Sequence, residues 1–185
     1  MSIASDPATP PVVAGTDERR KAARRRLPPG TLRRAVVFAT AYGAALTAAV
    51  ALDIALLGHA FGGRVASVIA LFGAAGLVAG FLAWPVAEFV VGRQRPATAR
   101  FAAMVVGLAF LTPGIAALIY FLQYRTYFAA FHDEAFTIIW VYQVLFTGAA
   151  AAFQFAVAGL RLLTPFGLVV LIMSGIAFAR SGRRT

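Results

Sequence analysis

The segment SVIALFGAAGLVAGFLAWPVAEFVV, residues 67–91, decides the fold class of this chain. It contains one ionisable side chain, Glu88, in 25 consecutive residues. A helix rises about 1.5 Å per residue, so a run of this length reaches across the roughly 30 Å hydrocarbon core of a bilayer. The segment therefore predicts a membrane-spanning α-helix.

Similar apolar runs occupy residues 35–57, 101–124 and 137–160, and a marginal fifth run covers 162–179. Thr164 and Pro165 are typical of an N-cap and a first helical residue, which predicts a separate last helix. We expect an all-α polytopic transmembrane bundle of five helices, four plus the marginal C-terminal one, at about 35–57, 67–91, 101–124, 137–160 and 165–180. They form one transmembrane domain over residues 31–185. Residues 1–30, rich in proline and basic side chains, are predicted to be a disordered cytoplasmic tail.

Composition supports lipid as the solvent, because 61% of residues are hydrophobic and 13% are charged. The absence of cysteine excludes disulfides, thiolate metal sites and cysteine nucleophiles. The formal net charge of +10 does not indicate nucleic-acid binding, since 12 of the 17 basic residues flank apolar segments. Abundant Ala, Gly, Pro and Arg indicate a GC-rich bacterial genome, so we expect a multi-pass protein of the bacterial inner membrane.

The basic residues also predict orientation, because Arg and Lys are retained on the cytoplasmic side. With a cytoplasmic N-terminus and five crossings, twelve basic residues lie inside and five outside. If the last segment does not cross, the distribution becomes fifteen to two. Charge favours four crossings and apolar length favours five; we predict five. The basic tail is expected to contact anionic lipid headgroups.

Polar side chains in the 137–160 segment recur at steps of three and four, on one side of a helix. The stripe comprises Trp140, Gln143, Thr147, Ala151, Gln154, Ala158 and Arg161, whereas Phe146, Phe153, Phe155 and Val157 lie off it. Amides are costly against lipid, so the stripe predicts a central helix that turns its polar side inward. The glutamines either form interhelical hydrogen bonds or line a path for a substrate or ion.

Two carboxylates, Asp53 and Glu88, lie within apolar segments, each about one turn from a helix end. Each is an interfacial group, a proton or cation ligand, or a member of an ion pair. Because Glu88 and Arg161 are predicted at similar depths near the inner ends of their helices, we predict an ion pair between them.

Small residues predict close helix packing. Gly73, Gly76 and Gly80 recur in one segment, and Gly43, Ala44 and Ala48 in the preceding one. Such residues serve internal packing or a homodimer equally well. Pro113 followed by Gly114 predicts a kink.

The connection over 123–136 contains His132, Asp133 and Glu134, and His59 lies in the other predicted outer loop. Three sequence neighbours point in different directions, so a metal or haem site is not favoured; Asp133 and Glu134 are interpreted as capping the next helix. No nucleotide-binding, zinc-protease or nucleophile motif is present, so we expect neither an enzyme nor a cofactor.

The leading hypothesis is an accessory, assembly or structural subunit that binds a membrane-protein partner or its own copy. The alternative is a small transporter or channel, with the enzyme class third. The polar path of such a transporter or channel would use Asp53, Gln123 and Gln143 in the outer half, and Glu88, Gln154 and Arg161 in the inner half.

Overall fold

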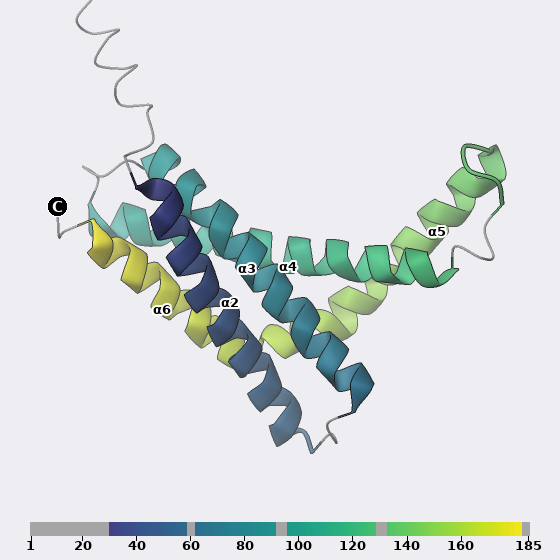
Figure 1. Ribbon diagram of the computed structural model, residues 1–185, viewed down its shortest axis with the longest axis horizontal. Helices are drawn as coiled ribbons and strands as arrows, with labels where there is room; N and C mark the ends of the chain where they lie inside the picture. Colours follow the sequence, from purple (N-terminus) through teal and green to yellow (C-terminus); the bar gives the residue numbers. More distant parts are fainter. Residues whose placement is uncertain (1–29, 59–61, 92–95, 129–132, 183–185) are drawn as a thin grey trace, which may run out of the picture.

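The computed structural model describes residues 30–58, 62–91, 96–128 and 133–182. In these ranges the chain forms α2 (Thr31–Leu56), α3 (Gly63–Val91), α4 (Ala97–Phe128), α5 (Ile138–Gln154) and α6 (Phe166–Ser181), with a π-helical turn η2 (Phe155–Gly159) and a 3₁₀ turn η3 (Leu160–Leu163) between the last two (Figure 1). The described part has no strand. Four helices, with the η turns counted in the fourth, are long and apolar enough to cross a membrane. The predicted all-α class and its five helices are confirmed. The predicted tail falls almost entirely outside the described residues.

α2 and α3 pack side by side through small residues. A Cβ built on Gly76 would lie 3.1 Å from Gly43 Cα, and one built on Gly80 would lie 3.0 Å from Ala39 Cα. Gly43 lies in this contact as predicted, whereas Ala44 and Ala48 are exposed and lie outside it. The glycines of α3 therefore serve internal packing.

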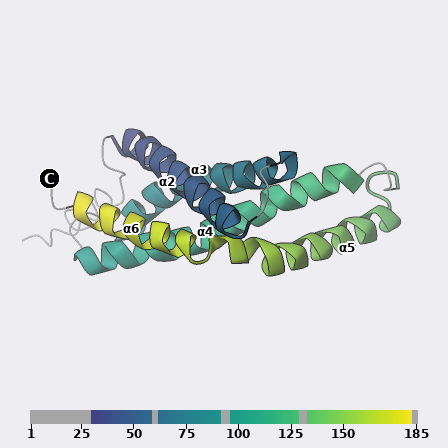
Figure 2. The ribbon, with the colours of Figure 1, turned by 90° about the horizontal axis from the view of Figure 1, so that it is seen from below.

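The first half of α4 and the whole of α6 complete a bundle with α2 and α3. Figure 2 shows α6 running alongside α4. A Cβ on Gly175 of α6 would lie 2.6 Å from Val105 Cγ2 of α4, so these helices also approach closely. α4 continues through Pro113 without a break.

The end of α6 lies beside the start of α4, because Arg100 Nη2 donates to the Phe178 carbonyl oxygen at 3.4 Å. The start of α2 lies at the same end of the bundle, where Thr31 bonds to Glu88 near the end of α3. Five alternating crossings would place the end of α6 at the opposite end from Thr31. This arrangement contradicts five alternating crossings. It fits a path of four passes, of which the fourth comprises α5, η2, η3 and α6.

The physical reason is the connection from α5 to α6. η2 and η3 change the direction of the chain without reversing it, so α5 and α6 together form one return path (Figure 1). Thr164 does not cap α6: its Oγ1 donates back to the Arg161 carbonyl at 3.0 Å. Pro165 is the N-cap residue, and α6 begins at Phe166.

The second half of α4 and α5 form a hairpin that projects from the bundle (Figure 1). We call its described residues, 121–128 and 133–154, the hairpin arm. Ala151 is the buried residue of the arm, and every other side chain described there is at least partly exposed. The expectation that the fourth helix is central is therefore wrong, because α5 packs mainly against α4.

Candidate functional site

Glu88, the carboxylate in the apolar segment 67–91, lies near the end of α3. It is buried at one end of the bundle, with 5% of its surface exposed. Its Oε2 accepts a hydrogen bond from Thr31 Oγ1 of α2 at 2.7 Å. Its Oε1 is buried and has no hydrogen-bond partner in the part of the chain that the structure describes. A carboxylate with one contact and one unpaired oxygen is costly in an apolar setting, so this position is a candidate for function.

One turn earlier on α3, Trp84 lies between aromatic rings of two other helices. Its ring centroid is 5.1 Å from that of Phe38 and 4.9 Å from that of Phe178, the latter in an edge-on geometry. The Trp84 Nε1 is buried, and no described residue accepts its proton. The Trp84 indole therefore adds a second unpaired polar atom, one helical turn before Glu88 on α3.

Arg100 of α4 is the third buried polar side chain at this end, with 3% exposed. Its guanidinium carbon lies 4.4 Å from the centroid of the Phe178 ring, a cation–π distance. Phe178 thus contacts both Arg100 and Trp84. We call Thr31, Trp84, Glu88 and Arg100 the buried polar cluster. Sequence reasoning found Glu88 alone, since an arginine at a helix start is typical of an orientation signal and predicts no burial.

The predicted ion pair between Glu88 and Arg161 is wrong. Arg161 is exposed and belongs to η3. Its neighbour Leu162 lines a hollow with Leu57 and Val65, which lie at the other end of α2 and α3. The two residues are at different depths because the fourth pass continues through η3 into α6.

The first part of the polar stripe lies on the side of α5 that faces α4. Gln143 and Thr147 are half-buried and Ala151 is buried, whereas Phe146, off the stripe, is 74% exposed. From Gln154 onward the pattern fails: Gln154, Ala158 and Arg161 of the stripe are exposed, while Phe155, which lies off it, is 8% exposed. A π-helical turn has more residues per turn than an α-helix, so η2 rotates the following side chains away from the predicted stripe.

Gln143, Thr147 and Gln154 of the stripe form hydrogen bonds with groups in the arm or where the arm joins the bundle. Gln143 Oε1 accepts from the backbone N–H of Asp133 at 2.8 Å. Thr147 Oγ1 donates to the Gln143 carbonyl at 2.6 Å. Gln154 Oε1 accepts from the Tyr120 hydroxyl of α4 at 2.5 Å. Of these three bonds, the one between Gln154 and Tyr120 joins two helices, as the interhelical interpretation predicts, whereas the other two are local to α5 and the segment before it.

The remaining candidates do not converge on one site. Asp53 is half-buried near the end of α2, and Gln123 is exposed on the arm. Asp133 and Glu134 are exposed, and Thr137 caps α5 instead of them, because its side chain accepts from the Trp140 N–H at 3.1 Å. His59 and His132 lie outside the described residues. Among described residues, no group of three His, Cys, Asp or Glu side chains could hold a metal ion.

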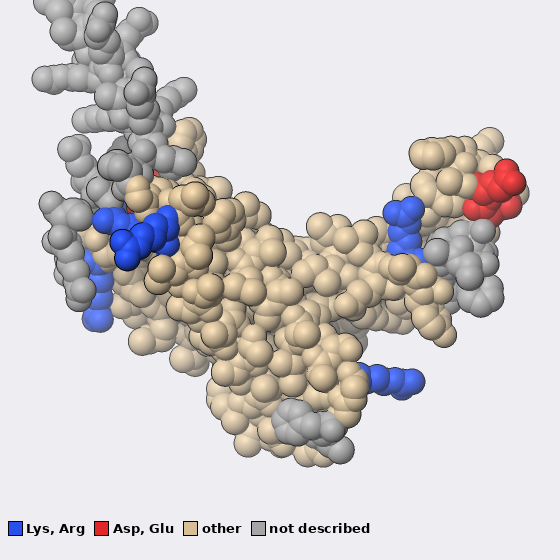
Figure 3. Space-filling view, in the orientation of Figure 1, with Lys and Arg blue, Asp and Glu red and all other residues tan. Residues whose placement is uncertain are grey.

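Many of the described charged side chains lie at two ends of the molecule, although Arg125 lies on the arm and Arg64 at the start of α3. In Figure 3 basic side chains gather where the described chain begins and α6 ends, and acidic side chains lie at the tip of the arm. The basic end carries Arg33, Arg34 and Arg180, and the acidic tip carries Asp133 and Glu134.

No protein-family model, curated protein or solved structure matches the chain. The described residues form an all-α fold whose four long apolar helices are compatible with a multi-pass membrane protein.

Proposed function

We propose that the protein is a non-catalytic subunit of a membrane complex, which uses the hairpin arm to bind the transmembrane helices of a different protein. The observation that carries the proposal is the contrast between arm and bundle. In the most apolar 18-residue window of each helix, 39% of residues are buried for α2 and for α3, against 11% for the fourth span. A helix that packs so little against its own chain has a large surface left for a partner.

The exposed side chains of the arm suit such a partner. Large apolar groups stand out along α5, namely Ile138 (77% exposed), Tyr142 (59%), Leu145 (62%) and Phe146 (74%). Aromatic and aliphatic side chains of this size anchor helix–helix contacts by van der Waals packing. These apolar groups lie along the length of α5, so the surface that they form fits apolar side chains of a partner helix.

The bundle supports a structural role over a transporter or channel. Its interior positions carry small or apolar side chains with almost no exposed surface, among them Val50, Ala75, Ala79, Met104 and Leu108. In the middle of the bundle, the buried hydroxyls of Tyr42 and Thr112 pair with each other at 2.9 Å. A closed and well-packed interior is what a scaffold requires, and it leaves no polar route along the helices.

We further propose a bacterial inner membrane location with the N-terminal end cytoplasmic. The four-pass path supports this orientation, because it brings Arg180 to the end that carries Arg33, Arg34 and Arg100. Fourteen of the seventeen basic residues then lie on one side, with Arg64, Arg125 and Arg161 as the exceptions, which is the distribution that the retention of positive charge favours.

The test is affinity purification of the tagged full-length chain in a mild detergent, followed by quantitative mass spectrometry. We expect one membrane protein to co-purify in a fixed ratio. Leu145→Ala with Phe146→Ala should lower that ratio strongly. The matched control, Phe89→Ala with Val90→Ala, removes side chains that are 60% and 69% exposed on α3, and should leave it unchanged. A chain that purifies alone or only as its own dimer, or equal ratios for both double variants, would contradict the proposal.

A further inference from the structure

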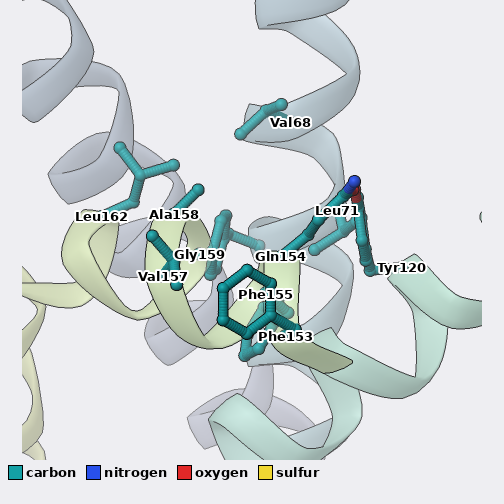
Figure 4. A pocket seen from close by; sticks show the side chains of 11 residues that line it. Val68, Leu71, Tyr120, Phe153, Gln154, Phe155, Val157, Ala158, Gly159 and Leu162 are labelled. Carbon is teal, nitrogen blue, oxygen red and sulfur yellow. The ribbon is translucent and has the colours of Figure 1, made fainter. Parts of the chain in front are cut away.

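A cavity of about 330 Å³ lies where the hairpin arm leaves the bundle (Figure 4). Its wall is formed by Leu71 and Phe72 of α3, Tyr120 of α4, Gln154 at the end of α5, and residues of η2 and η3. No charged side chain lines it. Its volume is within the range of small-molecule sites, roughly 300 to 1,000 Å³, and its position in the apolar segments places it in lipid rather than water.

Gln154 gives this cavity a directional polar group. Its Oε1 accepts from the Tyr120 hydroxyl at 2.5 Å, which leaves the Nε2 amide with two N–H donors. No described residue accepts from that nitrogen, and the Gln154 side chain is exposed. Figure 4 shows the amide beside the Tyr120 ring. An N–H group without an acceptor is unfavourable in hydrocarbon, so the site lacks one hydrogen-bond acceptor.

The backbone at the cavity is unusual in a second way. η2 is a five-residue π-helical turn, and Phe155, Val157, Ala158 and Gly159 in it all line the cavity. The turn directs Phe155 into the bundle, with its ring centroid 6.2 Å from that of Phe72 and 6.5 Å from that of Tyr120. Single π-helical turns inside helices occur frequently at functional sites. The turn therefore places the Phe155 ring in the wall of the same cavity as the Gln154 amide.

From these contacts we infer that the cavity binds a neutral, lipid-soluble ligand with an apolar body and a carbonyl oxygen that accepts from Gln154 Nε2. The apolar and aromatic wall disfavours charged groups, and the unpaired N–H groups of the amide favour a ligand that carries a hydrogen-bond acceptor. Two sources share this chemistry: the acyl ester of a glycerolipid and the ring carbonyl of a quinone. The ligand would fill the junction between α3 and the arm. This inference does not depend on the proposed binding of a partner protein to the exposed side of the arm.

The test is native mass spectrometry of the delipidated full-length protein in detergent, titrated with three probes. These are dioleoylglycerol, its diether analogue with the same hydroxyl group but no ester carbonyl, and decylubiquinone. Saturable binding of one equivalent of the diester, with about tenfold weaker binding of the diether, assigns the site to a glycerolipid. Saturable binding of decylubiquinone without binding of either lipid assigns it to a quinone. Failure of all three probes to saturate would overturn the inference.

Variants then locate the bound probe. Gln154→Leu should weaken binding about tenfold, because it removes one hydrogen bond. Ala158→Phe places a ring in the cavity and should abolish binding, whereas Ala152→Phe, exposed on the same helix but away from the cavity, should not change it. Thermal unfolding of each ligand-free variant separates lost binding from lost folding. Binding equal to that of the unmodified chain in both Gln154→Leu and Ala158→Phe would overturn the inference, as would a second copy of the chain held in the cavity, seen as a dimer that Ala158→Phe dissociates.

Discussion

Thr31 and Glu88 are joined by a hydrogen bond of 2.7 Å, in which the Thr31 hydroxyl donates to the carboxylate across 57 residues of sequence. This bond connects the first turn of α2 to the last turn of α3. The Glu88 carboxylate is only 5% exposed, and among the described residues Thr31 is its hydrogen-bond donor. The bond therefore ties the place where the chain enters the bundle to the buried polar cluster.

Replacing this hydroxyl should destabilise the bundle. Thr31→Val keeps the shape of the side chain but leaves Glu88 without its donor, so we expect a loss of about 1–3 kcal/mol in the free energy of unfolding. Thr31→Ser keeps the hydroxyl and should lose much less. The measurement is the folded fraction in detergent as temperature rises. Equal losses for Val and Ser would mean that the hydroxyl is not what stabilises this end.

The α2–α3 contact should be sensitive to a single methyl group. Gly80→Ala places a Cβ 3.0 Å from the Ala39 Cα, a backbone atom that moves only with its helix. We expect a loss of about 1–3 kcal/mol from overpacking. Gly114→Ala is the matched control, because a Cβ there meets nothing within 4 Å and alanine favours the helix by up to about 1 kcal/mol over glycine. A stabilised Gly80→Ala protein in the same thermal assay would show that the two helices are farther apart than described.

The number and approximate extent of the helices could be predicted from sequence because apolar length is a local property of the chain. The direction of α6 could not be predicted, because it depends on the π-helical turn at Phe155–Gly159. The same turn limits the polar stripe, since the predicted stripe assumes a constant period of about 3.6 residues past Gln154. The burial of Arg100 was missed for a similar reason. Its partner Phe178 is 78 residues away, and no local pattern connects them.

The four-pass path predicts which positions share a side of the membrane. Single cysteines can be placed in this cysteine-free chain at Ala97, Ser181 and Gly63. Ala97 begins α4 and Ser181 ends α6 at the same end of the bundle, whereas Gly63 begins α3 at the other end. With an impermeant thiol reagent on intact spheroplasts, we expect Gly63→Cys to react, and Ala97→Cys and Ser181→Cys to react only after lysis.

Two outcomes of this labelling have different consequences. Reaction of Ala97→Cys and Ser181→Cys without lysis, with Gly63→Cys protected, would reverse the proposed orientation but keep the four-pass path. Reaction of Ser181→Cys together with Gly63→Cys would contradict the path itself and restore five crossings. Labelling of all three after lysis is the control for accessibility.

The bond between Tyr42 and Thr112 should show measurable coupling in the middle of the bundle. The two oxygens are 2.9 Å apart, each side chain is 3% exposed, and the pair joins α2 to α4. Tyr42→Phe and Thr112→Val each leave one buried hydroxyl without its partner, whereas the double variant removes both groups and should lose less than the sum of the two. Interhelical hydrogen bonds in membranes give coupling energies of about 0.6 kcal/mol on average and up to about 1.7 kcal/mol. Full burial of both hydroxyls places this pair towards the upper value.

A second cycle provides the matched control for that coupling. Thr126 lies on the hairpin arm and donates to the Leu122 carbonyl of its own helix, so Thr126→Val combined with Tyr42→Phe removes two hydroxyls that do not meet. Independent sites add to within about 0.3–0.5 kcal/mol, which sets the resolution of the comparison. The folded fraction of all variants should be measured in one detergent as temperature rises. If the Tyr42–Thr112 cycle is as additive as the control cycle, the hydrogen bond does not stabilise the bundle, and the contact of α4 with α2 depends on apolar packing alone.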